Sequence, residues 1–223
     1  MNRVIKDTAD GSRTIFVEAL DEHYHSIHGA LAESRHVFIQ SGLDTIKNKN
    51  ISILEIGFGT GLNLITTLEH NQSLHKNIHY TGVEAYPVSK SDYSKLNYSQ
   101  LNLEESVLPF LNKIHETEWE VFQDIAPNFL LKKEEKKFQD IEEKEAFDLI
   151  YFDAFAPTAQ PELWTESIFE KMFAALKPNG ILVTYCAKGQ VKRNMKAVGF
   201  TIERLPGPPG KREMTRATKP ISE

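Results

Sequence analysis

The sequence lacks the features that mark secreted and membrane proteins. Cys186 is the single cysteine among 223 residues, so no internal disulfide can form, as is usual in a reducing compartment. No apolar run reaches the roughly 18 residues that a membrane-spanning helix needs. The first residues, MNRVIKDTADGSR, contain no apolar stretch like that of a signal peptide. We therefore expect a cytoplasmic protein with no membrane partner.

A surplus of positive charge is also missing. The chain has 26 Lys or Arg residues against 31 Asp or Glu residues, a net charge of −5, whereas proteins bind nucleic acids largely through Lys and Arg. The distribution is uneven, because residues 186–223 contain nine Lys or Arg and only three Asp or Glu. This basic end predicts contact with a polyanion, and a solvated basic tail is the alternative.

The remaining composition is that of an ordinary globular chain. Hydrophobic residues make up 40% and charged residues 26%, which excludes collagen-like and wholly disordered chains. No internal repeat occurs. A chain of this length is expected to bury a large core in a single domain.

Residues 1–45 are predicted to form a hairpin and a helix that pack on residues 46–223 as one compact unit. In residues 3–17, two apolar runs flank Asp10-Gly11, a pair typical of tight hairpin turns. In residues 21–41, apolar side chains recur at helical spacing, with Asp21 as a cap and Gly42 as a stop.

Short apolar runs alternate with helical patterns along residues 46–223, which predicts an α/β fold with a mostly parallel sheet and helices on both faces. Residues 85–117 are expected to be mostly helical, and residues 119–140 are left open between an exposed hairpin and a helical turn. A helix with Pro161 near its start is expected to end just before Gly180. The strands are expected at 51–57, 78–84, 146–155, 180–186, 200–205 and 213–218, and the main helices at 62–70, 161–179 and 188–198.

The strongest chemical signal is the loop Glu55-Ile56-Gly57-Phe58-Gly59-Thr60-Gly61, between a predicted strand and a predicted helix. Alternate glycines allow a sharp turn and a close approach of ligand to main chain, and the helix N-terminus offers unpaired N–H groups. Dinucleotide loops read G-x-G-x-x-G instead, and the Glu55 carboxylate would repel a pyrophosphate and attract a cationic amino-acid group. A purely structural glycine turn is the alternative.

Two carboxylates farther along the chain fit the same nucleotide-like ligand. Glu84 ends a predicted strand 23 residues after Gly61, and in Rossmann-type sites an acidic residue about 20 residues on accepts hydrogen bonds from ribose hydroxyls. Asp140 precedes the next predicted strand and is a candidate acceptor for an adenine amino group. A solvated strand end and a surface turn are the respective alternatives.

Asp153, in Phe152-Asp153-Ala154-Phe155-Ala156-Pro157, ends a predicted strand at the edge where open α/β sheets bind ligands. A carboxylate among aromatic side chains can hold a cationic amine there and take its proton, directly or through water, because only a neutral amine attacks a methyl group. Positioning and the exclusion of water supply much of the rate of such a displacement. A helix-capping aspartate is the alternative.

Histidines cluster near the N-terminus, where His23, His25 and His28 surround Tyr24. Zinc sites combine cysteines or paired histidines at set spacings, and no such partner accompanies this cluster. We expect no metal, and instead expect contacts with substrate or with a helix end.

These segments resemble a known family. EIGFGTGLN, GVE, FDAFAP followed by PELWT, and YHSIHGALAESRHVF are similar to the methyltransferase domain of the tRNA 5-methylaminomethyl-2-thiouridine biosynthesis family, over most of the chain. Many methyltransferases share the glycine loop, whereas the other segments are more particular to this family. The resemblance implies a Rossmann-like, class I methyltransferase that uses S-adenosylmethionine to methylate the aminomethyl group at carbon 5 of the wobble uridine in the tRNA anticodon loop.

The resemblance also implies a role for each candidate residue. Glu55, Gly57, Gly59, Gly61 and the Thr60 between them would bind the methionine end of the cofactor. Glu84 would bind its ribose and Asp140 its adenine. Asp153 would bind the amine, and Tyr24, His25 and Phe155 would contact the uracil ring. The aromatic residues suit the last role because bases stack on aromatic rings.

Bifunctional members of the family continue into a flavin-dependent oxidase domain, whereas this chain is expected to use no flavin and to need no obligate protein partner. Lys211 and Arg212, in the basic C-terminal part, are expected to contact tRNA. A methyltransferase or propylamine transferase of this fold acting on a small-molecule or protein amine is one alternative. A non-catalytic RNA-binding protein is another, because fold alone does not decide function, but it predicts a damaged cofactor loop.

Overall fold

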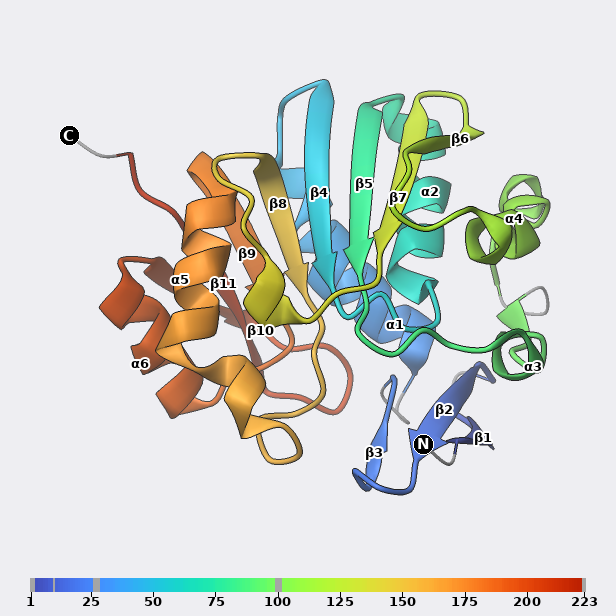
Figure 1. Ribbon diagram of the computed structural model, residues 1–223, viewed down its shortest axis with the longest axis horizontal. Coiled ribbons are helices and arrows are strands. Elements are labelled where there is room, and N and C mark those ends of the chain that lie inside the picture. Colours follow the sequence, from blue (N-terminus) through green and yellow to red (C-terminus); the bar gives the residue numbers. More distant parts are fainter. Residues whose placement is uncertain (1–2, 10, 26–28, 99–101, 222–223) are drawn as a thin grey trace.

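The computed structural model describes residues 3–9, 11–25, 29–98 and 102–221, which contain an eight-stranded sheet and a three-stranded sheet (Figure 1). The strands of the larger sheet are β4 (Asn50–Ile56), β5 (Asn77–Val83), β6 (Gln123–Ala126), β7 (Phe129–Glu134), β8 (Phe147–Phe152), β9 (Leu176–Thr184), β10 (Thr201–Pro206) and β11 (Glu213–Thr218). They lie in the order β10-β11-β9-β8-β4-β5-β7-β6. The inner strands from β9 to β7 are parallel, and antiparallel strands complete both edges. This confirms the predicted mostly parallel sheet.

Helices cover both faces of the large sheet, as predicted (Figure 1). One face packs against α1 (Ala30–Ser34), the π-helical segment η1 (Arg35–Gln40) and α2 (Leu62–Leu74). The other packs against α5 (Glu166–Ala175) and α6 (Gly189–Val198). Each helical layer therefore encloses its own hydrophobic core.

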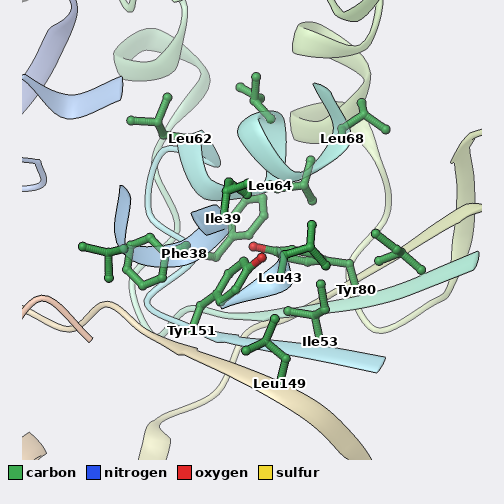
Figure 2. Packing of buried hydrophobic residues seen from close by; sticks show 14 of the residues in the cluster. Phe38, Ile39, Leu43, Ile53, Leu62, Leu64, Leu68, Tyr80, Leu149 and Tyr151 are labelled. Carbon is green, nitrogen blue, oxygen red and sulfur yellow. The ribbon is translucent and has the colours of Figure 1, made fainter. Parts of the chain in front are cut away.

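Alternate side chains of the inner strands point into opposite cores, as the two-residue period of a strand requires. In β8, Leu149 and Tyr151 belong to the first core, whereas Ile150 and Phe152 belong to the second. Figure 2 shows Leu149 and Tyr151 packed among residues of η1, α2 and the neighbouring strands. Burial on both faces explains why these strands read as continuous apolar runs in the sequence.

The N-terminal hairpin is confirmed, and a third strand joins it. β1 (Arg3–Asp7), β2 (Arg13–Val17) and β3 (Glu22–His23) form an antiparallel sheet, which lies beyond the carboxyl ends of β4 and β5 (Figure 1). The helix predicted over residues 21–41 is wrong in its first part. Asp21 has a φ of 51° and turns the chain back, so that residues 22–23 pair with β2 and the helix begins at Ala30.

The predicted division between residues 1–45 and 46–223 falls between the short 3₁₀ helix η2 (Leu43–Thr45) and β4. Contacts do cross it, since η1 packs against α2 and β9. The division itself stays a prediction.

Residues 84–140 differ most from expectation. Among its described residues, the expected helical region contains the short elements α3 (Lys90–Tyr93), the 3₁₀ helix η4 (Glu105–Val107) and α4 (Phe110–Glu116). The region left open is a hairpin of β6 and β7, but β7 is also an inner strand, parallel to β5. The sequence did not predict β7 as an inner strand because of its charged residues, yet Lys133 and Glu134 are only 1% and 4% exposed. The Lys133 ammonium donates to the His115 carbonyl (2.9 Å) and lies 4.9 Å from the Trp119 ring centre.

The predicted helix 161–179 is shorter than expected. The 3₁₀ helix η6 (Pro161–Trp164) precedes α5, which ends at Ala175 because Leu176 already begins β9. Gly180 therefore lies inside a strand and does not end a helix, which corrects the prediction. A Cβ there would approach the Lys177 carbonyl oxygen to 2.8 Å. No helix in the described part of the chain is long and apolar enough to cross a membrane.

Candidate active site

A cavity of about 520 Å³ opens at the carboxyl ends of the inner strands, where open α/β sheets bind ligands. Its size is typical of small-molecule sites. The loops after β4, β5 and β8, the N-terminal sheet and the segment before β11 all contribute to its walls. Residues predicted from the sequence that line it are Tyr24, His25, Gly57, Gly59, Glu84, Asp153, Phe155 and Lys211.

The glycine loop presents bare main chain to this cavity. Gly57, Gly59 and Gly61 have φ values of 86°, 50° and 75°, which L side chains rarely adopt. A Cβ on Gly57 would lie 2.5 Å from the Asp153 carbonyl oxygen, and one on Gly59 would lie 2.9 Å from the Tyr24 ring. The loop is therefore built around the absence of side chains, and α2 begins directly after Gly61.

Glu84 follows the last residue of β5 and is tied to the same loop. Its Oε2 accepts a hydrogen bond from the Gly59 N–H (3.0 Å), and its Oε1 accepts one from the Tyr86 N–H (2.9 Å). Burial raises its pKa, and the two N–H groups oppose this rise. The carboxylate is thus held in one orientation on the cavity wall, and its predicted contact with a ribose stays a prediction.

Beneath the loop, Asn63 joins two carboxylates. Its Nδ2 donates to Glu55 Oε1 (2.9 Å) and to Asp153 Oδ2 (2.8 Å). The Ser34 hydroxyl donates to Asn63 Oδ1 (2.7 Å), which sets the orientation of the amide. Sequence reasoning missed Asn63, although it stands two positions after Gly61 within EIGFGTGLN, because nothing in the sequence shows that both carboxylates reach it.

Glu55 lies below the cavity and not on its wall. Its side chain is 0% exposed, and its Oε2 accepts a hydrogen bond from the Tyr80 hydroxyl (2.8 Å). Burial raises its pKa well above the usual range. The structure therefore shows Glu55 supporting Asn63, and its predicted contact with the cofactor stays a prediction.

Asp153 follows β8 and faces the cavity. Burial, followed by the nearby Glu33 carboxylate, raises its pKa to about 7, while Asn63 and Lys211 act in the opposite direction. Its carboxyl group therefore changes charge close to neutral pH. Glu33, from α1, was also missed, although it belongs to the YHSIHGALAESRHVF segment that the resemblance singled out.

Aromatic side chains form the adjoining wall. The Tyr24 and Phe155 rings meet edge to face with their centres 5.1 Å apart. Arg3 of β1 donates to the Tyr24 hydroxyl (3.1 Å) and to the Tyr86 carbonyl (2.7 Å). Burial raises the pKa of Tyr24 to about 12, so this ring stays neutral. Arg3 thereby joins the N-terminal sheet to the loop that follows Glu84.

Thr60 and Gly61 lie behind the lining residues. The Thr60 hydroxyl is 2.5 Å from His25 Nε2 and accepts a hydrogen bond from the Tyr98 hydroxyl (2.5 Å). Thr60 therefore connects the glycine loop to a residue of the cavity wall. His23 also lines the cavity, whereas His28 lies outside the described residues. Those residues include no group of three His, Cys, Asp or Glu side chains placed to hold a metal ion.

Two further predicted residues, like Glu55, Thr60 and Gly61, do not line the cavity. Asp140 ends the 3₁₀ helix η5 (Phe138–Asp140) and is exposed, and Gln139 lines the cavity in its place. Arg212 is exposed outside the cavity, whereas Lys211 lines it. The structure thus separates Lys211, which is half-buried in the cavity wall, from Arg212, which is on an open surface. Their predicted contacts with tRNA stay predictions.

The cavity is acidic overall. Its lining has five carboxylate residues, Glu22, Glu33, Glu84, Asp153 and Glu162, and two lysines, Lys137 and Lys211. Such a surface attracts cations and repels phosphate groups. The cavity therefore favours a cationic ligand beside its main-chain cradle.

The family model described as S-adenosyl-L-methionine-dependent methyltransferase matches residues 83–220. The chain belongs to this family. It is an enzyme that transfers a methyl group from S-adenosylmethionine, and its fold is that of the class I methyltransferases.

Relatives confirm the resemblance found in the sequence. The tRNA 5-methylaminomethyl-2-thiouridine biosynthesis bifunctional protein MnmC of Leptospira borgpetersenii is 32% identical over 217 residues, which cover 88% of this chain and 32% of that protein. The protein of the same name from Pseudoalteromonas translucida is 30% identical over 226 residues, which cover 89% and 34% of the two chains. The methyltransferase chain thus spans about a third of the length of these relatives.

Solved structures agree with this assignment. The methyltransferase matches MNMC2 from Aquifex aeolicus with a TM-score of 0.80 at 26% identity, over 100% of this chain and 73% of the other. Spermidine synthase from Thermotoga maritima matches with a TM-score of 0.54 at 15% identity, over 100% and 75% of the two chains. The second likeness shows the fold alone.

Proposed function

We propose that this methyltransferase methylates the aminomethyl group at carbon 5 of the wobble uridine in tRNA, giving 5-methylaminomethyl-(2-thio)uridine. The observation that carries the proposal is the position of Asp153, a half-buried carboxylate in an acidic cavity beside the aromatic pair Tyr24 and Phe155. The substrate group combines a cationic amine with a flat ring. A carboxylate pairs with the cationic amine, and aromatic side chains pack against the flat ring.

The names of the relatives support the same substrate, since they concern 5-methylaminomethyl-2-thiouridine in tRNA. The exposed Arg212 and the other basic residues of the C-terminal part offer contacts for phosphates outside the acidic cavity. A tRNA that already has its aminomethyl group requires neither flavin nor metal for this step. A cytoplasmic location, expected from the sequence, suits such a substrate.

When bound, S-adenosylmethionine supplies an electrophilic methyl group on its sulfonium sulfur. We assign its binding to the Gly57 and Gly59 main chain, because both glycines line the cavity without side chains, and a Cβ at either position would clash with the Asp153 carbonyl or the Tyr24 ring of its wall. Glu84 is assigned to the ribose hydroxyls and the η5 segment to the adenine. Within that segment Gln139 lines the cavity, and the predicted contact of Asp140 requires the exposed side chain to turn inward.

Asp153 binds the protonated amine and accepts its proton. Because its pKa is about 7, its carboxylate can pair with the ammonium group and then take a proton from it near neutral pH. Asn63 fixes Oδ2 of this carboxylate, so the amine meets an acceptor that is already oriented. The aromatic wall excludes water from the same space, which favours the neutral, nucleophilic amine.

The test supplies purified protein with labelled S-adenosylmethionine and tRNA from cells that accumulate 5-aminomethyl-(2-thio)uridine. The tRNA is digested and the labelled nucleoside is identified by mass spectrometry. We expect label in 5-methylaminomethyl-(2-thio)uridine and none in matched tRNA that lacks the aminomethyl group. Confirmed donor binding without labelled nucleoside would refute the tRNA substrate and redirect the search to small-molecule and protein amines.

A further inference from the structure

A second charged pair lies in the cavity wall beside Asp153. The Lys211 ammonium forms an ion pair with Glu33 Oε2, and it lies 3.9 Å from the centre of the Tyr185 ring. The Glu33 and Lys211 side chains are 12% and 32% exposed, and both line the cavity with Asp153. Nothing in the binding of donor or tRNA described above requires this pair.

The pair is held by segments distant in sequence. Glu33 is part of α1, Lys211 precedes β11, and Tyr185 follows β9. The Tyr185 hydroxyl donates to the carbonyl oxygen of Ala154 (2.8 Å), the residue after Asp153. A ring that supports the lysine is therefore attached to the same loop as the carboxylate. This arrangement keeps both charges near Asp153 before any ligand arrives.

We propose that Glu33 and Lys211 are positioning residues that act as a pair to set how readily Asp153 takes the proton of the substrate ammonium group. The inference rests on the amine methylation proposed above. Glu33 strengthens the attraction of Asp153 for a proton, and Lys211 limits it. With both charges present, Asp153 can accept the proton during the reaction and release it to water afterwards.

The step balances in protons and electrons. An N–H bond of the ammonium group breaks, and its proton forms an O–H bond on Asp153. The freed nitrogen lone pair then forms the N–C bond to the methyl group, while the C–S electron pair stays on sulfur. A cation near the amine also favours its neutral form, so Lys211 assists the loss of the same proton.

Other groups also face Asp153, and the test leaves them unchanged. Asn63 of α2 donates to it, and Asn63 also holds Glu55 of β4, which in turn accepts a hydrogen bond from Tyr80 of β5. Tyr185 contributes from the end of β9, where burial, and then the Asp153 charge, raises the pKa of its hydroxyl. Variants of Glu33 and Lys211 leave these side chains in place, and the only one of them that contacts the pair is Tyr185, through Lys211.

The decisive measurement is kcat/KM for tRNA methylation against pH. Glu33→Gln leaves an unpaired lysine near Asp153, so the acidic limb of the profile should move to lower pH, by about one unit. Lys211→Met leaves an unpaired glutamate, so the limb should move to higher pH by about the same amount. In Lys211→Arg and in the double variant Glu33→Gln/Lys211→Met, the net charge near Asp153 is that of the parent, so the acidic limb should stay near its parent pH.

A direct titration separates this inference from the proposed function. Carbon-13 NMR of protein labelled in its aspartate carboxyl groups follows Asp153, with Asp153→Asn used to assign its signal, and requires no turnover. Lys177→Met is the matched control, because Lys177 pairs with Asp148 (2.9 Å) at the opposite end of β8. It should leave the Asp153 titration unchanged.

Opposite displacements of the Asp153 titration in Glu33→Gln and Lys211→Met would support the pair. Displacements in the same direction, or none in variants with parent-like circular dichroism, would overturn it. If the parent protein does not methylate the tRNA, the proposed function fails in that assay. The NMR titration still decides whether the pair of Glu33 and Lys211 controls the pKa of Asp153.

Discussion

Replacing Asp153 by asparagine should make the protein more stable, and increasingly so as pH rises. Burial and Glu33 raise the pKa of this carboxyl group from 3.8 to about 7 in the folded state. The folded protein therefore binds the proton more tightly than the unfolded chain, and the parent loses stability as pH rises from about 4 to about 7. Asparagine has the same shape and an oxygen that can accept the Asn63 N–H, but it has no proton to lose.

The magnitude follows from the two pKa values. One pKa unit corresponds to about 1.4 kcal/mol, so the full rise from 3.8 to about 7 corresponds to about 4 kcal/mol. Much of the loss has already occurred at pH 5.5. Between pH 5.5 and pH 8.5, the advantage of the Asp153→Asn variant over the parent should grow by about 2 kcal/mol.

Urea unfolding at these two pH values measures the difference directly. The matched control is Asp7→Asn, because the Asp7 side chain is 80% exposed on the N-terminal sheet. The free energy of unfolding of this variant should change with pH as that of the parent does. The same Asp153→Asn protein should lose methyl transfer by about 100-fold or more. An equal advantage at pH 5.5 and pH 8.5 would refute the argument that Asp153 exchanges its proton near neutral pH.

Three further variants test other parts of the site. Gly59→Ala should weaken S-adenosylmethionine binding by about tenfold or more in calorimetry, because the new Cβ meets the Tyr24 ring at 2.9 Å; unchanged affinity would remove the loop from the donor site. Asn63→Ala should lower the free energy of unfolding at pH 8 by about 3 kcal/mol, because the buried Glu55 and the half-buried Asp153 lose their common donor. Urea unfolding equal to that of the parent would contradict the network. Arg3→Met should raise KM for S-adenosylmethionine several-fold with little change in kcat, since Arg3 holds the loop after Glu84. An unchanged KM in steady-state kinetics would show that the loop keeps its position without Arg3.

Much of the core could be predicted because local patterns determine it. The apolar runs that became β4, β5 and β8 are buried on both faces, and the glycines after β4 adopt the positive φ values that their residue type allows. Glu84 and Asp153 stand directly after such runs, so a parallel sheet brings them to one edge. The family resemblance predicted the methyl donor, and it supplied the substrate class that we propose for the enzyme.

Local patterns failed where contacts with other elements override them. Residues 22–23 lie in a segment with helical spacing but pair with β2, because a turn at Asp21 brings them alongside it. β7 looks like a charged surface segment, but Lys133 is buried because a carbonyl and the Trp119 ring bind its ammonium group. In both cases contacts with another element outweigh a weak local preference.

The fold class, the glycine loop and the carboxylates at the strand ends followed from the sequence alone, because each depends on neighbours within a few positions. The tertiary structure was needed to show that Asn63 joins Glu55 to Asp153, and that Lys211 pairs with Glu33 in the cavity wall. Asn63 and Asp153 are 90 positions apart, and Glu33 and Lys211 are 178 positions apart. These two contacts depend on strand order, register and helix packing together, so no single stretch of sequence contains them.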